Sequence, residues 1–156
     1  MTLYTETIGS QWTNSYGWGT DSPCGDQTHS SWYGLTCEYG HVTHLSLRRN
    51  GLQGVLPTSL EGLHSLKSLS LSSNQISGTI PTEIGTLVSL ERDLDLFGNQ
   101  ISGTIPSELG KLTHVKRLNL FWNHIKGTIP GELSNLHLDE CALVGTMAST
   151  NRFECP

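Results

Sequence analysis

The stretch NQISGTIPTEIGTLVSLERDLDLFGNQISGTIPSELG, residues 74–110, contains nearly the same phrase twice. Residues 74–81 return unchanged as residues 99–106, one position later than the spacing of the neighbouring copies would place them. Repetition at a nearly fixed period is the sequence signature of a solenoid, in which each unit buries its apolar side only against its neighbours. The period therefore predicts a stack of similar coils.

Several residue types mark the same period over most of the 156-residue chain. Glycines recur at Gly54, Gly78, Gly103, Gly127 and Gly145. Asparagines and prolines keep the step at Asn50, Asn74, Asn99, Asn123 and at Pro57, Pro81, Pro106, Pro130. Leucine-type residues fill the intervals, for example Leu66, Leu69, Leu71 and Ile76 in one copy. Four near-complete copies are present, so the repeat is not a chance match.

Each part of the repeat has a physical role. The alternation in L-x-L points leucines to one side and the intervening residues to the other, which is typical of a short strand. Stacked copies then pair these strands in a parallel sheet at about 4.8 Å spacing. An inward asparagine can satisfy backbone groups of adjacent turns, and proline after the glycine suits a tight return on the outer face.

The pattern L-x-x-L-x-L-x-x-N-x-L-x-G-x-I-P-x-x-L-x-x-L-x-x resembles the leucine-rich repeat, in particular the 24-residue subtype of plant cell-surface receptors and polygalacturonase-inhibitor-like proteins. The resemblance covers about residues 42–147. It implies an α/β repeat solenoid, a right-handed coil with a parallel β-sheet on the concave face and irregular or short helical convex segments. The expected organisation is a cap over residues 1–41, about four full repeats and one shortened repeat over residues 42–147, and a short C-terminal cap or a truncation over residues 148–156.

Two irregularities interrupt the repeat. One extra residue lies between Leu90 and Leu94, and we predict a β-bulge at Arg92–Asp93, a tolerated surface insertion being the alternative. Gly145 follows Gly127 much sooner than the other glycines of the repeat follow one another, which predicts a final coil with a shortened outer arc and with Cys141 in the asparagine position.

The four cysteines form two local pairs near the ends of the chain, Cys24 with Cys37 and Cys141 with Cys155. Neither pair has the spacing of a zinc site, and we predict disulfides and therefore an oxidising compartment. Reduced thiols are the alternative for both pairs, and Cys141 is equally explained as a buried ladder residue. The first pair and the segment W-Y-G-L-T-C, residues 32–37, resemble the cysteine-paired N-terminal cap of the family.

The apolar residues of the first 41 positions are expected to cover the first leucine layer, with a short helix over residues 3–9. They are Leu3, Tyr4, Ile8, Trp12, Trp18, Trp32 and Tyr33. A carbohydrate platform is the alternative, but their position before the first strand favours packing.

Composition and motifs exclude several classes of function. The net charge of −5 argues against a nucleic-acid partner, and no apolar run approaches the roughly 18 residues of a membrane span. The seven histidines fall at different repeat positions, only His44 and His137 are expected in strands, and no hydrolase, zinc-protease, P-loop or dinucleotide motif is present. We therefore predict no catalytic residue, no metal and no cofactor.

The concave face is the predicted recognition surface. Residues between the leucines form rows across the coils, and we expect His137, Asp139 and Glu140 to continue these rows in the last coil. Phe97, Phe121 and Trp122 occupy positions that core packing does not explain, and cationic residues are expected to give the face a positive bias. The predicted partner-binding residues are Arg48, Arg49, Lys67, Asp95, Phe97, Lys116, Arg117, Asn119, Phe121 and Trp122.

The expected function is non-enzymatic recognition of a protein or peptide, with association of that partner with an acidic polysaccharide as a further option, by a monomer that is secreted or at the cell surface. The N-terminus lacks the pattern of a signal peptide, so a cytoplasmic location stays open. Two other functions stay open. The recurring Thr79, Thr104, Thr128 and Thr146 would suit an ice-binding solenoid, and the short final repeat would suit a fragment of a receptor ectodomain or a structural piece without its own ligand.

Overall fold

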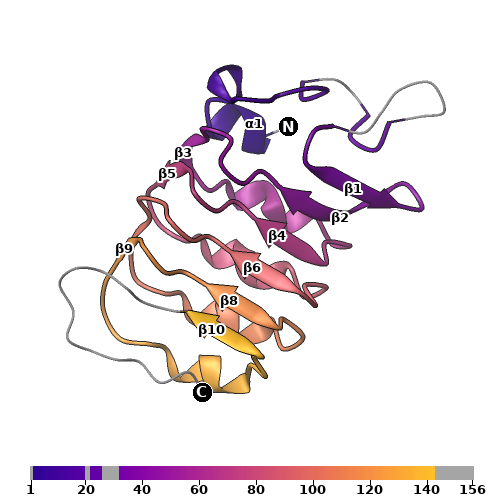
Figure 1. Ribbon diagram of the computed structural model, residues 1–156. Coiled ribbons are helices and arrows are strands. Elements are labelled where there is room, and N and C mark those ends of the chain that lie inside the picture. The colour runs from indigo at the N-terminus through magenta and orange to yellow at the C-terminus, as the bar shows by residue number, and fades with distance from the viewer. Residues whose placement is uncertain (1, 20–21, 26–31, 143–156) are drawn as a thin grey trace.

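The computed structural model describes residues 2–19, 22–25 and 32–142. These residues form a curved stack of coils with the strands on one side and short helices on the other (Figure 1). We number the coils by their first core residue: coil 1 is residues 42–65, coil 2 is 66–89, coil 3 is 90–114, coil 4 is 115–137, and coil 5 is described over 138–142. The solenoid predicted from the repeat is confirmed.

The main sheet of the described residues has six strands in the order β1-β2-β4-β6-β8-β10. The bounds are β1 Leu35–Glu38, β2 His41–Ser46, β4 Ser68–Ser70, β6 Asp93–Asp95, β8 Arg117–Asn119 and β10 Glu140–Ala142. The first pair is an antiparallel hairpin, and all the following pairs are parallel. One strand per coil is the arrangement that the L-x-L alternation predicts.

A second, shorter set of strands lies where each coil leaves the main sheet. These strands are β3 Gln53–Val55, β5 Gln75–Ser77, β7 Ser102–Gly103 and β9 His124–Ile125. They pair in parallel as β3 with β5 and β7 with β9, and Thr79 bridges to Ser102 between the two pairs.

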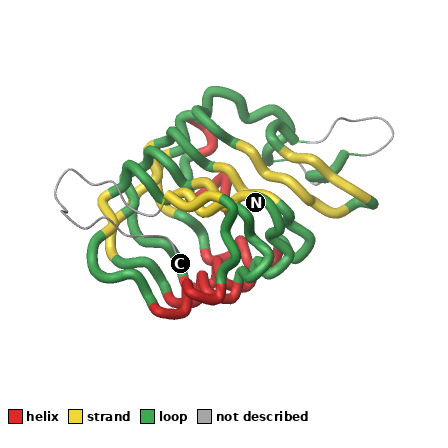
Figure 2. Tube along the Cα trace, turned by 60° about the horizontal axis from the view of Figure 1, so that its bottom comes forward, coloured by secondary structure: helices red, strands yellow, loops and turns green. Residues whose placement is uncertain are grey.

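The outer arc of each of coils 1 to 4 carries a 3₁₀ helix, and Figure 2 shows these helices in red along one side of the stack. They are η2 Thr58–Gly62, η3 Thr82–Thr86, η4 Ser107–Lys111 and η5 Gly131–Asn135. Each follows a proline with φ between −60° and −75°, so the ring that fixes φ also starts the helix. The tight return predicted for this segment is confirmed.

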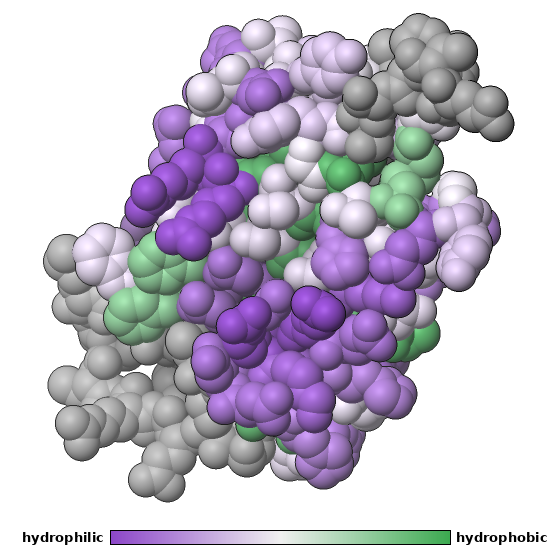
Figure 3. Space-filling model, turned by 45° about the vertical axis from the view of Figure 1, so that its right-hand side comes forward, coloured by the Kyte–Doolittle hydropathy of each residue, from purple (hydrophilic) through white to green (hydrophobic). Residues whose placement is uncertain are grey.

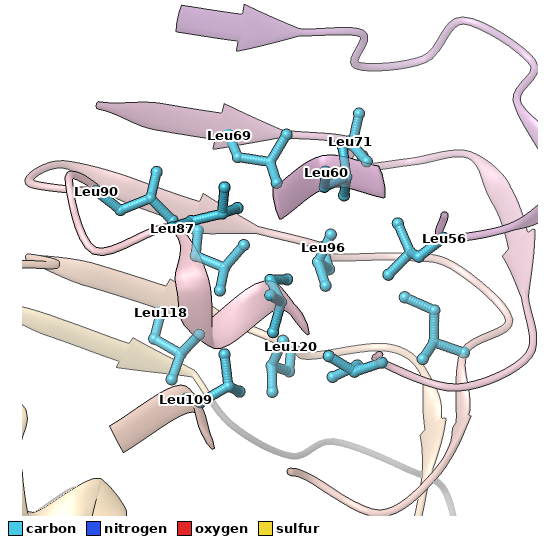
Figure 4. Close-up of a cluster of buried hydrophobic side chains, with 14 of the residues drawn as sticks. Leu56, Leu60, Leu69, Leu71, Leu87, Leu90, Leu96, Leu109, Leu118 and Leu120 are labelled. Carbon is cyan, nitrogen blue, oxygen red and sulfur yellow. The ribbon is translucent and has the colours of Figure 1, made fainter. Parts of the chain in front are cut away.

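Leucine side chains from the strands meet those from the helices and form the core (Figure 4). Leu69 and Leu71 of coil 2, Leu94 and Leu96 of coil 3 and Leu118 of coil 4 are at most 1% exposed. Because the layers repeat, each coil buries its apolar residues against the coil before and the coil after.

The buried asparagines form a ladder along the stack. Nδ2 of Asn99 donates to the carbonyl oxygens of Leu71 and Leu96, both at 3.0 Å, and its Oδ1 accepts from the backbone N–H of Ile76 at 3.0 Å. Asn74 and Asn123 make the equivalent bonds to their own coil and to the coil before. The predicted pairing of asparagine with the backbone of adjacent turns is confirmed.

The N-terminal cap continues this ladder. Asn50 donates through Nδ2 to the carbonyl oxygen of Asn14 at 2.9 Å and accepts through Oδ1 from the N–H of Asn14 at 2.7 Å. The cap contains α1 Thr2–Glu6 and a 3₁₀ turn, η1 Gly9–Gln11, so the predicted helix over residues 3–9 is shorter than expected. The predicted disulfide between Cys24 and Cys37 is present.

The aromatic residues of the cap pack on one another and on the core. Trp12 and Trp32 are buried, and the rings of Tyr4, Trp12 and Trp18 lie within 6.4 Å of each other, centroid to centroid. Ile8 and Tyr33 are the exceptions, since each is 40% exposed. Core packing is therefore confirmed for most of this group, but the assignment of Ile8 and Tyr33 to the core is wrong.

The extra residue of coil 3 makes a bulge at Arg92–Asp93, as predicted. The N–H of Arg92 donates to the carbonyl oxygen of Lys67 at 3.1 Å, just as the N–H of Arg117, which lies opposite Asp93, donates to the carbonyl oxygen of Arg92 at 2.9 Å. Arg92 therefore lies opposite Ser68. Leu94 pairs with Leu69 in the next rung, so the bulge restores the register of the strand. Arg92 and Asp93 thus share the place opposite Ser68, where the neighbouring coils have one residue, and the predicted site of the bulge is confirmed.

The outer arc of the final coil, which is predicted to be shortened, lies outside the described residues, but the arc of coil 4 that leads into this coil carries a full helix. The helix η5 follows η4 at the same interval at which η3 follows η2, and the strand pairs Cys141 with Leu118 and Glu140 with Arg117. Cys141 therefore occupies the strand position of Leu118 and not the asparagine position, because the linker before the strand is one residue shorter than in the other coils. Cys155, Gly145, Thr146 and the predicted C-terminal segment 148–156 lie outside the described residues.

Candidate functional site

A cluster of three aromatic side chains lies where coils 3 and 4 leave the main sheet. The rings of Phe97, Phe121 and Trp122 are 6.2 to 6.3 Å apart, centroid to centroid, and the two phenylalanine rings are stacked at 12°. Trp122 is 61% exposed, and both phenylalanines are partly exposed. Figure 3 shows an apolar patch at the left of a largely hydrophilic face. The predicted position of these residues outside the core is confirmed.

The backbone that carries the phenylalanines is fixed on both sides. The N–H of Phe97 donates to Oδ1 of Asp95 at 3.1 Å, and the N–H of Phe121 donates to Oδ1 of Asn119 at 3.2 Å. The carbonyl oxygen of Phe97 accepts from the N–H of Ser73 at 2.7 Å. Asp95 and Asn119 thus position the aromatic residues that follow them, and the cluster is organised before any partner binds.

Trp122 has a left-handed backbone, with φ of 57°. The equivalent position of every complete coil is left-handed, at Arg49, Ser73 and Gly98. A glycine adopts this conformation without cost, whereas a bulky side chain is strained in it by about 1 kcal/mol or more. Coil 4 therefore keeps a large exposed aromatic residue at a position that favours glycine.

A polar groove of about 430 Å³ lies beside the aromatic cluster on the concave face. It is lined by Arg48, Ser70, Asp93, Asp95, Arg117, Leu118, Asn119 and Glu140. Four of the predicted partner-binding residues, Arg48, Asp95, Arg117 and Asn119, are thus brought together. Asp93, Ser70 and Glu140 were not among the predicted binding residues, although the row through Ser68 and Arg117 would have pointed to Asp93.

The carboxylates of the groove are held by neighbouring coils. Asp93 accepts from Oγ of Ser68 at 3.2 Å and from Nε of Arg117, and Asp95 accepts from Oγ of Ser70 at 3.1 Å. The hydrogen bond and the charge of Asp93 raise the pKa of the Arg117 guanidinium above its ordinary value. Arg48 has no carboxylate within ion-pair distance among the described residues.

The predicted positive bias of this face is wrong. Two cations and three carboxylates line the groove, and Arg117 is paired with Asp93. Lys67 and Lys116 do not reach the groove, because they lie at the opposite edge, where the strands begin. There Lys67 pairs with Glu38 at 3.0 Å and Lys116 lies 4.0 Å from Asp139.

The predicted positions of His137, Asp139 and Glu140 in the rows of the concave face are also wrong. Ala142 lies opposite Asn119, and Glu140 lies opposite Arg117, so His137 and Asp139 precede the strand. Arg49 is exposed at the left-handed turn after β2 and lines none of the grooves named here. His41 and His124 lie in strands and His137 does not, which corrects the expected placement of the histidines.

Among the described residues, no cluster of three or more histidines, cysteines or carboxylates is placed to hold a metal ion. In the same part of the chain, no helix has the length and apolar character that crossing a membrane requires.

Sequence models described as leucine rich repeat match residues 40–101, 92–112 and 114–136, more than half of the chain. The chain is 45% identical over 58 residues to a receptor protein kinase, WSS1, of Oryza sativa subsp. japonica, and this match spans 35% of the chain and 6% of that protein. The chain thus spans a small part of that relative.

Two solved structures show the likeness over nearly the whole chain. The BIR3–SERK2 complex from Arabidopsis thaliana matches with a TM-score of 0.73 and 28% identity, over 92% of this chain and 80% of the matched one. A plant ice-binding protein matches with a TM-score of 0.77 and 27% identity, over 91% of this chain and 45% of that one.

Proposed function

From the premise that this chain belongs to the leucine-rich repeat family, we propose that it is a non-enzymatic module that binds a protein or peptide through its concave face. The observation that carries the proposal is the exposed cluster of Phe97, Phe121 and Trp122. Large aromatic residues in a prearranged backbone are typical of the anchors that dominate the energy of protein interfaces.

The groove beside the cluster indicates how a partner is oriented. An apolar side chain of the partner packs on the aromatic rings, and the neighbouring polar part of the partner lies over Asp95, Asn119 and Arg48. Because Asp93 and Arg117 satisfy each other, they contribute specificity more than affinity. The partner is expected to be an extended segment, since the groove runs across several coils.

The relatives and the cap support an extracellular setting for this binding. One solved neighbour is a complex between two proteins, and the curated relative is a receptor kinase. The disulfide between Cys24 and Cys37 forms in oxidising compartments. We place the chain in the secreted or cell-surface class, as a monomer. The narrower resemblance to polygalacturonase inhibitors and a partner associated with an acidic polysaccharide stay predictions.

The test is capture of a partner by the purified chain from the extracellular fraction of the source organism. The double variant Phe121→Ala/Trp122→Ala is compared with Tyr16→Ala, which removes a 64% exposed aromatic residue from the cap. We expect the double variant to lose at least 90% of the captured partner, because two anchors contribute about 2 kcal/mol or more each. Equal capture by the double variant and the wild type would show that the cluster is not the binding site.

Ice binding is the second candidate, favoured by the likeness to a plant ice-binding protein and by the exposed Thr79, Thr104 and Thr128. The packing argues against it. The Cγ2 methyls of Thr79 and Thr104 lie against Gly103 and Gly127 of the next coil, and Oγ of Ser77 and Ser102 donates to backbone carbonyls of the coil before. These groups hold the coils together. Thermal hysteresis of the purified chain would support the ice-binding candidate, and we expect none.

A structural fragment without its own ligand is the third candidate. It predicts that capture does not depend on any concave-face residue, so the same pair of variants separates it from recognition.

A further inference from the structure

The residue that follows the first ladder asparagine differs from its equivalents in the other coils. Coils 2 to 4 have Gln75, Gln100 and His124 directly after the asparagine, whereas coil 1 has Gly51. Asn50 and Gly51 form the only Asn-Gly pair in the sequence. The backbone differs as well, since Gly51 has a φ of 72° and its three equivalents have no positive φ. Coil 1 therefore departs from the repeat at the residue where the cap meets it.

The backbone nitrogen of Gly51 is not engaged in the stack. The N–H groups of Gln75, Gln100 and His124 each donate to a carbonyl oxygen of the coil before, at 2.7 to 2.8 Å. Among the described residues, the N–H of Gly51 has no hydrogen-bond partner, because coil 1 follows the cap and not another coil. The cap covers this glycine, since a Cβ at position 51 would lie 3.5 Å from Oγ1 of Thr13.

The side chain of Asn50 joins the cap to coil 1. Its Nδ2 donates to the carbonyl oxygen of Asn14 at 2.9 Å, and its Oδ1 accepts from the N–H of Asn14 at 2.7 Å. The N–H of Thr13 donates to the carbonyl oxygen of Asn50 at 2.9 Å. Asn50 is 2% exposed, so its amide is held in place and shielded from water while the cap is closed.

An Asn-Gly pair that is free to move undergoes a known reaction of amides. The backbone nitrogen of the glycine attacks Cγ of the asparagine, because glycine has no side chain to obstruct the approach. The new N–Cγ bond closes a succinimide ring, the Cγ–Nδ2 bond breaks, and Nδ2 leaves as ammonia with the proton of the glycine N–H. Water then opens the ring at either carbonyl carbon and leaves an aspartate or an isoaspartate.

We propose that Asn50 is a deamidation site that the closed cap protects, and that reaction after the cap has opened prevents it from closing again. A carboxylate at position 50 cannot donate to the carbonyl oxygen of Asn14, and closing the cap would bury its charge. An isoaspartate also adds one carbon to the main chain next to Leu52, which is fully buried in the first leucine layer. This modification site goes beyond the proposed function of the concave face.

The test follows deamidation of the full chain at pH 7.4 and 37 °C, in buffer and in 6 M urea. A glutamate-specific protease releases residues 39–61, in which Asn50 is the only asparagine, and mass spectrometry measures the product. We expect the native chain to react at least about tenfold more slowly than the chain in urea, because the hydrogen bonds and packing of the cap must be lost first. Gly51→Ala is expected to slow the reaction in urea, where only the approach to Cγ matters.

Cap variants test whether opening of the cap limits the native reaction. Trp12→Ala removes a side chain that is 6% exposed and is expected to accelerate deamidation about tenfold in buffer but not in urea. Tyr16→Ala, which removes a 64% exposed aromatic residue of the cap, is expected to react like the wild type. Circular dichroism shows whether the variants are folded. If Trp12→Ala is not, Trp12→Phe replaces it, because it loses only the hydrogen bond to the carbonyl oxygen of Thr7 and part of the packing.

The product is mimicked by Asn50→Asp. Its tryptophan emission is expected to shift to longer wavelength, because Trp12, Trp18 and Trp32 lie in the cap and gain contact with water when it opens. Gln100→Glu places the same charge at an exposed position of coil 3 and is expected to keep the wild-type emission. Circular dichroism of Asn50→Asp should show that the coils stay folded.

Three outcomes overturn the proposal. They are equal rates of deamidation in buffer and in urea, no acceleration by the folded Trp12 variant, and wild-type emission of Asn50→Asp. Phe121→Ala/Trp122→Ala is expected to deamidate at the wild-type rate, so the result is independent of the concave-face proposal.

Discussion

Coils 1 and 2 share their scaffold with coils 3 and 4 but differ from them on the concave face. In both pairs the strands carry buried leucines and the turns carry a ladder asparagine with the same hydrogen bonds. The face of coil 1 carries Ser46, Arg48 and Arg49, and that of coil 2 carries the small hydroxyl residues Ser70, Ser72 and Ser73. Coils 3 and 4 have Asp95, Phe97, Asn119, Phe121 and Trp122 at the corresponding positions. The repeat therefore fixes the scaffold, and the departures from it lie mainly in coils 3 and 4, where we propose that a partner binds.

Removing a ladder asparagine from each half is the strongest test of whether the two halves share one scaffold. Asn74→Ala and Asn99→Ala are each expected to lower the free energy of unfolding by about 3 kcal/mol, because buried carbonyl and N–H groups lose their partners. Chemical denaturation measures both values. If one substitution were neutral and the other severe, the two halves would not share one scaffold.

A smaller effect on stability is expected at the left-handed turn positions, which the two halves also share. The free energy of unfolding of Trp122→Gly is expected to be about 1 kcal/mol higher than that of Trp122→Ala. The same difference is expected between Ser73→Gly and Ser73→Ala. Gly98→Ala should lower the free energy of unfolding of the wild type by about the same amount. Its added Cβ meets only an ordinary contact at 3.7 Å, so the positive φ alone is unfavourable. Thermal unfolding of the five variants tests this, and an alanine variant as stable as its glycine counterpart would contradict it.

Deletion of Glu91 tests whether the irregular coil depends on its extra residue. We expect the free energy of unfolding to change by less than about 1 kcal/mol, because the ladder and core residues of coil 3 lie on either side of the bulge. The deletion makes coil 3 as long as coil 2. A loss of several kcal/mol in denaturant titration would show that the bulge is required for the register of β6.

The smallest effect comes from the ion pairs of the two halves. Glu38 raises the pKa of Lys67 above the ordinary value of 10.5, first through a hydrogen bond and then through its charge. The stabilising contribution of Lys67 is therefore complete below pH 10.5 and is lost as the pH rises through the raised value.

The measurement compares stability between pH 9 and pH 11.5 for Lys67→Met and Arg117→Gln. The difference between wild type and Lys67→Met should shrink over this range. The difference for Arg117→Gln should stay constant, because the hydrogen bond and the charge of Asp93 raise the pKa of Arg117 above its already high ordinary value. A constant difference for Lys67→Met would exclude the ion pair as its cause.

The scaffold could be predicted from the sequence because its information is local and repeated. The residues equivalent to Asn99 and Leu96 have the same surroundings in coils 1 to 4. Each copy of the repeat therefore supports the same prediction for the others. The prediction for the last strand is wrong because Leu136, Leu138 and Cys141 fit the repeat pattern in two registers. Only the pairing of Cys141 with Leu118 decides between these registers. A linker that is one residue shorter changes the register without changing the composition.

The aromatic residues of the site could be predicted from the sequence, but the balance of positive and negative charges around them could not. Phe97, Phe121 and Trp122 stood out because no buried position required them. The pairing of Arg117 with Asp93 depends on side chains of different coils. Such contacts are set by the stacking of coils and are not visible in the repeat pattern.

The asparagine ladder also decides how the molecule opens. The amide proton of Ile76 is held by Asn99 of the next coil, and that of Ile101 is held by Asn123, so each is released only when the seam between two coils parts. Hydrogen exchange at these amides therefore reports on seams and not on single coils. Because Asn14 closes the first seam with Asn50, we expect the cap to protect coil 1 from fraying.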